Sequence, residues 1–140
     1  MTRATILRVM AKTLIPFILL FALYVQFHGD YGPGGGFQAG VIFAAGFVLY
    51  ALIFGLSATR RIAQPRVIEI LIAVGVLIFA GAGVATMLLG GAFLEYGAFT
   101  PSHPEHGQHW GLLVVEFGVG VTVASVMIAV FATFAGRGRA

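Results

Sequence analysis

The sequence has 140 residues, of which 59% are hydrophobic and only 9% are charged, whereas an average soluble domain is about 25% charged. A small soluble domain needs many polar side chains to cover its surface, so a mean hydropathy of +1.00 excludes that class and indicates an integral membrane protein. The absence of cysteine excludes disulfides, thiolate nucleophiles and cysteine-based metal centres, and eight Lys and Arg residues are too few for a nucleic-acid-binding protein.

Four apolar stretches are long enough to cross a membrane. A helix rises about 1.5 Å per residue and the hydrocarbon layer is about 30 Å thick, so one span needs roughly 20 mostly apolar residues. The stretches lack the period-2 alternation of barrel strands, which favours helices. We therefore predict an all-α integral membrane protein, a single domain over residues 1–140, with four transmembrane helices at about residues 13–27, 36–57, 67–89 and 111–134.

The basic residues predict how these helices are oriented. All eight precede the first span, separate the second from the third, or follow the fourth: Arg3, Arg8, Lys12, Arg60, Arg61, Arg66, Arg137 and Arg139. Because cytoplasmic loops of membrane proteins carry the excess of Lys and Arg, we expect both termini in the cytoplasm. The two remaining loops, about residues 28–35 and 93–110, are then outside.

Small residues recur at helical spacing in three of the four spans. In the fourth span Gly111, Gly118 and Ser125 follow one another every seven residues, and the third span contains Gly75 and Gly83. In lipid, such residues let two helix backbones approach closely. Two interpretations stay open: these faces meet one another inside a four-helix bundle, or some of them bind helices of other proteins.

A glycine-rich hairpin joins the first two spans. Its turn and the following helix start contain Gly32, Pro33, Gly34, Gly35, Gly36, Phe37 and Gly40. This composition predicts an irregular, tightly turned backbone. A phosphate-binding loop is excluded because no Gly-Lys-Ser/Thr follows. A structural turn is favoured over a loop that binds an anion or water.

The segment Gly-Pro-Gly-Gly-Gly-Phe-Gln-Ala-Gly at residues 32–40 resembles the signature of the MnhB/MrpB subunit of multisubunit Mrp-type sodium/proton antiporters, where it also follows the first span. In the last span, residues 116–119 (Glu-Phe-Gly-Val) are similar to a second family element, which often has Asp in place of Glu116. The family often has Asn-Ala before the proline, whereas this chain has Tyr31-Gly32. Four spans in 140 residues also agree with the family's size.

The resemblance implies a non-catalytic subunit, and not an enzyme, of a complex in the bacterial cytoplasmic membrane that exchanges Na⁺ or another monovalent cation for protons. Its partners would be the other subunits, the lipid bilayer and the transported ions, and no cofactor is expected. Its contribution would be to assembly and to part of an ion route. Two alternatives remain: the same module in a redox-driven assembly similar to complex I or membrane-bound hydrogenase, and a self-sufficient small homo-oligomeric transporter.

Glu116 is the one acid predicted well inside a span. It lies six residues after Trp110, about 9 Å below the outer interface at 1.5 Å per residue, where an isolated carboxylate is costly. Every Lys and Arg is predicted on the opposite side, so a proton, a histidine, water or a basic residue of another subunit must compensate the charge. We predict an ion or proton route through Glu116 with His28 and Asp30. The alternative is a buried, hydrogen-bonded acid that helps to fix the assembly.

The outer loop at residues 102–109 contains three histidines and Glu105. A zinc site of the His-Glu-x-x-His type needs a continuous helix, and Pro104 and Gly107 predict an irregular segment instead. We therefore predict a solvated loop and no metal site.

Overall fold

The computed structural model of the chain describes residues 3–29 and 31–137. Its elements are α1 (Arg3–His28), α2 (Gly36–Phe54), α3 (Leu56–Ile62), α4 (Pro65–Leu88), the short 3₁₀ helix η1 (Tyr96–Phe99) and α5 (Pro104–Arg137). No strand occurs within these residues, and α1, α2, α4 and α5 are long and apolar enough to cross a membrane. The prediction of an all-α protein with four transmembrane helices is confirmed.

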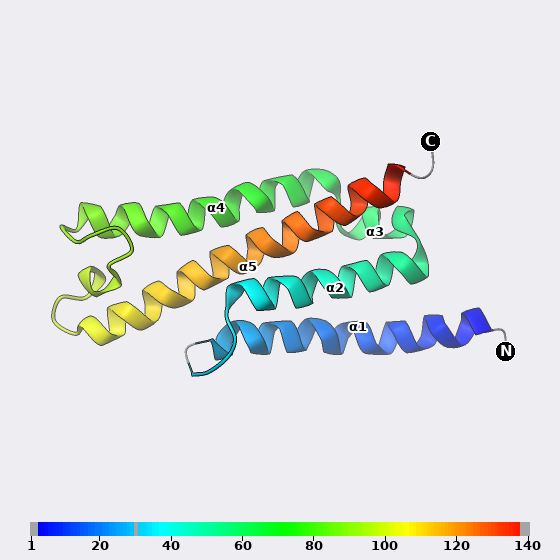
Figure 1. The fold of residues 1–140 in the computed structure, drawn as a ribbon, viewed down its shortest axis with the longest axis horizontal. Helices are drawn as coiled ribbons and strands as arrows, with labels where there is room; N and C mark the ends of the chain where they lie inside the picture. The colour runs from blue at the N-terminus through cyan, green and yellow to red at the C-terminus, as the bar shows by residue number, and fades with distance from the viewer. Residues whose placement is uncertain (1–2, 30, 138–140) are drawn as a thin grey trace.

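The four long helices lie side by side in a row (Figure 1). α5 is in the middle and packs against α2 on one side and α4 on the other, while α1 packs on the far side of α2. α1 begins and α5 ends at the same end of the row, as an even number of crossings requires. The helices therefore form a curved layer and not the closed four-helix bundle considered from the sequence.

The helix ends differ from the predicted spans where local backbone chemistry outweighs hydropathy. The predicted second span ran to residue 57, but α2 ends at Phe54 because Gly55 has a φ of +93°, which a residue with a side chain rarely adopts. The Gly55 N–H donates to the carbonyl of Ala51 (2.9 Å) and its own carbonyl accepts from the N–H of Thr59 (3.2 Å), so α3 begins at once. The predicted inner loop is thus largely helical.

The two terminal helices are longer than their predicted spans. α1 begins at residue 3 and not 13, and α5 begins at residue 104 and not 111. The prediction that residues 104–109 are irregular was wrong. Proline is well tolerated in the first turn of a helix, and Gly107 allows α5 to approach the main-chain oxygen of Tyr96, which would lie 2.6 Å from a Cβ at that position. With 34 residues α5 is about 51 Å long, more than the hydrocarbon layer needs.

Glycines form the contacts between α5 and its neighbours. A Cβ atom on Gly75 of α4 would lie 2.7 Å from the carbonyl oxygen of Gly118, and one on Gly118 would lie 2.9 Å from that of Gly75. On the other side of α5, a Cβ on Gly40 of α2 would lie 2.7 Å from the carbonyl oxygen of Gly120. At these positions the small-residue faces therefore meet within this chain, backbone against backbone.

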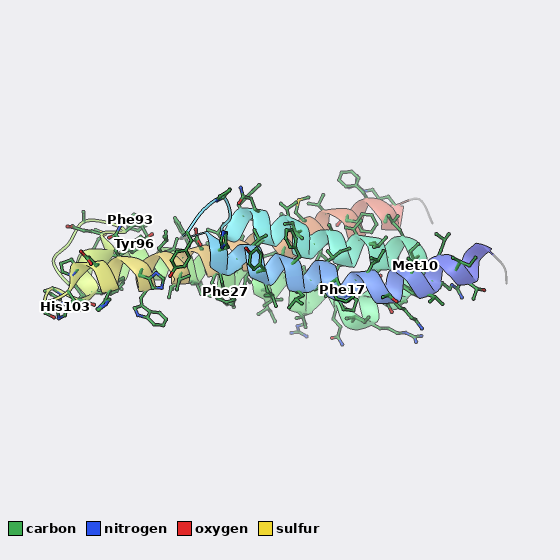
Figure 2. The ribbon with its side chains drawn as sticks, turned by 90° about the horizontal axis from the view of Figure 1, so that it is seen from below. Met10, Phe17, Phe27, Phe93, Tyr96 and His103 are labelled. Carbon is green, nitrogen blue, oxygen red and sulfur yellow. The ribbon has the colours of Figure 1, made fainter. Side chains whose placement is uncertain are left out.

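The other small residues named from the sequence are also covered. Gly83 faces the ring of Phe93 and Gly111 faces the ring of Tyr96, both from the segment between α4 and α5, and Ser125 is buried. Figure 2 shows Phe93, Tyr96 and His103 gathered at one end of the molecule, while Met10, Phe17 and Phe27 are spread along α1. The segment between α4 and α5 thus closes over the beginning of α5.

Candidate functional site

The glycine-rich hairpin is folded back onto the end of α1. Gly35 has a φ of +116°, which reverses the chain ahead of α2, and its N–H donates to the carbonyl of Val25 (3.1 Å). A Cβ on Gly34 would lie 2.8 Å from the same carbonyl oxygen. The carbonyl of Gly35 in turn accepts from the N–H of Ala39 (3.0 Å), which starts α2. The hairpin is therefore held at both of its ends.

This hairpin encloses the side chain of Glu116 on α5. A Cβ on Gly35 would lie 2.9 Å from Oε1 of Glu116, and a Cβ on Gly29 would lie 2.9 Å from Oε2. A Cβ on Gly36 would overlap the main-chain oxygen of Glu116. Oε2 is buried from solvent. Glycine at positions 29 and 35 allows the hairpin backbone to approach the carboxylate, and glycine at position 36 allows it to approach the main chain of Glu116.

One side of Glu116 is open. The carboxylate lines a depression of about 300 Å³, whose other walls are Gly34, Gly35, Gly36, Phe37 and Gln38 of the hairpin and α2, and Val115 and Val119 of α5. Phe37 is itself exposed at the rim. A water molecule, an ion or a side chain of another protein can therefore reach the side of the carboxylate that the hairpin does not cover.

Tyr96 covers the start of α5 near Glu116. Its side chain in η1 is only 9% exposed and its ring packs on Gly111. Burial raises the pKa of Tyr96 above its ordinary value of 10.0, and the negative charge of Glu116 raises it further. Tyr96 was not among the site residues predicted from the sequence. The only signal was its place among the aromatic residues near the predicted outer boundary.

Of the other two residues predicted for the route, the structure describes His28. His28 ends α1, where its ring stacks on Tyr24 with 5.1 Å between centroids, and a Cβ on Gly32 would lie 3.4 Å from its Nε2. His28 is thus at the base of the hairpin. Asp30 lies outside the described residues.

Of the three histidines at residues 102–109, His103 directly precedes α5, and His106 and His109 lie in its first turns. The rings of His103 and His106 are 5.7 Å apart, and His109 contacts Trp110 with its ring edge at 6.1 Å. Among residues 3–29 and 31–137, no group of three or more His, Cys, Asp or Glu side chains is arranged to hold a metal ion.

Comparison with known proteins identifies the family. The model of the family described as a domain related to the MnhB subunit of Na⁺/H⁺ antiporter matches residues 6–129. The chain belongs to the MnhB family. Proteins provisionally named antiporter subunit mnhB2 from the Staphylococcus aureus strains Newman, JH1 and USA300 are each 31% identical to it over 133 residues, which is 94% of this chain and 94% of each relative.

The family match agrees with the four membrane-spanning helices. The chain is an MnhB-type subunit of a Na⁺/H⁺ antiporter and a multi-pass protein of the bacterial inner membrane. The match is to a transporter component, and it favours neither the redox-driven assembly nor the self-sufficient homo-oligomer considered from the sequence.

Proposed function

We propose that this protein is a non-catalytic subunit of a multisubunit secondary-active antiporter that exchanges Na⁺ for protons, and that Glu116 takes up and releases protons or monovalent cations on an ion route. The observation that carries the proposal is the close approach of Gly29 and Gly35 to the Glu116 carboxylate beside an open depression. Ionisable residues inside membrane helices are costly and most often functional.

The position of Glu116 in the row of helices supports this role. Lys12, Arg60, Arg61 and Arg137 belong to the end where α1 begins and α5 ends, whereas Glu116 is beside the hairpin at the other end of α1. A proton, a histidine, a bound cation or another subunit must therefore balance its charge. Of these, the proton and the cation are species that an antiporter moves, and a histidine or a group of another subunit can relay them.

His28 and Asp30 complete the proposed route. His28 lies at the base of the hairpin, and Asp30 follows Gly29, which contacts the Glu116 carboxylate. The proposed path therefore runs from the outer surface, along the hairpin, to the carboxylate.

A role in assembly is supported by the exposed apolar surface next to this site. Tyr31 and Phe37 of the hairpin, Phe27 at the end of α1 and Trp110 of α5 all expose most of their side chains. We propose that other subunits of the antiporter cover this surface and the open side of Glu116.

The test is Glu116→Gln in the complete complex. The amide keeps the shape of the side chain but cannot exchange protons or carry charge, so we expect loss of most Na⁺-dependent proton movement in inverted membrane vesicles between about pH 6 and 9, with the complex still assembled. Glu69→Gln is the matched control, because Glu69 is an exposed acid on α4 away from the hairpin. Wild-type exchange by the Glu116→Gln complex would overturn the proposed route.

A further inference from the structure

A second hollow lies on the curved layer away from Glu116. It is an apolar groove of about 370 Å³ with residues of all four long helices in its lining. Its floor includes Gly40 of α2 and Ala124 of α5, and its walls include Phe27 of α1 and Leu71 of α4. Within residues 3–29 and 31–137, no charged side chain lines it. α2 and α5 are the two inner helices of the row, and α1 and α4 are the outer ones. The groove lies over the inner helices, between the outer ones.

The dimensions of the groove match a single hydrocarbon chain. Along α5 it extends from Phe117 to Ile128, about 16 Å at 1.5 Å per residue. A dry cavity of about 150 Å³ accepts benzene, with six carbon atoms, so by the same ratio the groove accepts about fifteen carbons. A helix segment of equal length and about 10 Å diameter would need about 1,200 Å³. The volume therefore suits an acyl chain, whereas it would take up only about a third of the cross-section of a transmembrane helix.

Two arginines adjoin, in the chain, the residues that line one end of the groove. The lining there comes from Ile62 and Ala63, after α3, and from Val67, in the first turn of α4. Arg61 and Arg66 are the chain neighbours of these lining residues, and both are exposed.

Other basic residues at the same end of the row are directed elsewhere. Lys12 lies over the ring of Phe54, with Nζ 5.9 Å from its centroid, and the guanidinium of Arg137 lies over the ring of Phe134 at 5.7 Å. Arg60 reaches α5, where its terminal nitrogen would lie 3.1 Å from a Cβ on Gly136. Of the basic residues that the structure describes, Arg61 and Arg66 are therefore the ones adjacent in the chain to the groove lining.

We propose that this groove binds one acyl chain of an anionic phospholipid whose headgroup lies beside Arg61 and Arg66. The apolar lining and volume suit the chain, and the two guanidinium groups suit the phosphate of the headgroup. The lipid belongs to the leaflet on the arginine side of the membrane. It fills a space that α1, α2, α4 and α5 leave open among themselves.

Native mass spectrometry of the full chain tests the headgroup preference. We expect the chain to retain phosphatidylglycerol over phosphatidylcholine with the same acyl chains, by roughly fivefold for each arginine. Arg61→Gln with Arg66→Gln removes the preference, while the matched control Arg8→Gln with Arg137→Gln keeps it. Equal retention of both lipids, or an equal loss of preference in the control, would overturn the proposal.

A crosslinking experiment in the complete complex tests what occupies the groove. The photoreactive residue p-benzoylphenylalanine at Leu71, which is 37% exposed and lines the groove, should acquire the mass of one phospholipid on irradiation of native membranes. The same residue at Leu77, which is exposed on α4 and outside the groove lining, reports the background of bulk lipid. A protein adduct at position 71, or a lipid adduct no more frequent than at position 77, would overturn the proposal.

Discussion

The helices α5 and α1 are both apolar enough to cross a membrane, yet they are packed very differently. α5 lies between α2 and α4. Glycines allow close backbone contact on both sides of α5, at Gly40 with Gly120 and at Gly75 with Gly118. α1 lies at the edge of the row, and many of its large side chains are exposed, with Phe17 64% and Phe27 61% exposed. Since apolar side chains gain little by leaving lipid for protein, close backbone approach at small residues decides which helix becomes central.

Gly75→Leu should destabilise the packing of α5 more than any other substitution considered below. A side chain at position 75 would collide with the hydroxyl of Thr122 and the carbonyl oxygen of Gly118, so α4 and α5 would have to separate. Overpacking of this kind costs typically 1–3 kcal/mol and more where backbone must move. We expect a much lower yield of folded protein and a reduced unfolding temperature in detergent.

Two control variants define the specificity of that effect. Gly81→Leu on the same helix should be tolerated, because no atom lies within 4 Å of a Cβ at that position. Phe17→Leu on α1 should change the free energy of unfolding by less than about 0.5 kcal/mol, as for other surface substitutions. If Gly81→Leu destabilised the protein as much as Gly75→Leu, the loss could not be assigned to the α4–α5 contact, because leucine favours a helix more than glycine does.

Gly35→Ala should reduce stability less than Gly75→Leu, and it should act on the hairpin that contacts α5. Its φ of +116° and ψ of 177° are a conformation nearly restricted to glycine, at a cost of about 1–3 kcal/mol for other residues. The added Cβ would also press on Oε1 of Glu116. We expect lower stability together with impaired Na⁺/H⁺ exchange.

Gly55→Ala separates these two causes. Gly55 has a similar backbone conformation, φ +93° and ψ 156°, but no atom lies within 4 Å of its Cβ position. It should lose stability to a similar extent and keep its exchange activity per assembled complex. Equal loss of exchange in both variants would show that backbone strain alone, and not the contact with Glu116, is responsible.

The smallest effect is expected for the titration of Tyr96, measured as tyrosinate absorbance. In Glu116→Gln the pKa of Tyr96 should fall but stay above 10.0, because burial is the larger cause of its rise and remains. A phenol whose pKa is raised by folding stabilises the fold below the unfolded pKa, and this contribution is lost as the pH rises through the folded pKa. Glu105→Gln should leave the titration unchanged. An unaltered pKa of Tyr96 in Glu116→Gln would show that the charge of Glu116 does not act on Tyr96.

Hydropathy predicted the number of long helices and the start of α2 at Gly36, because both depend on local composition. It did not predict the break at Gly55, since glycine is common within membrane helices and its positive φ has no signature in hydropathy. The early start of α5 was missed because residues 104–109 are polar and begin with a proline, although that residue suits a first turn.

The candidate site was predicted in separate parts. The hairpin and Glu116 were each selected from the sequence, but about 80 residues separate them, and nothing in their spacing indicated that Gly35 contacts Glu116. Tyr96 was missed for a related reason. Its burial depends on the fold of the segment between α4 and α5, where the N–H of Leu94 donates to the hydroxyl of Thr86 (3.0 Å).

The arrangement of the helices in a row restricts how any ion could pass this subunit. A pore needs walls on all sides. The long helices in the described part of the chain form a single layer with two broad faces and enclose no channel. The carboxylate of Glu116 opens onto one such face through the depression beside the hairpin. The ion route proposed through Glu116 therefore requires a neighbouring molecule to supply its missing wall, which would place the route at an interface between subunits.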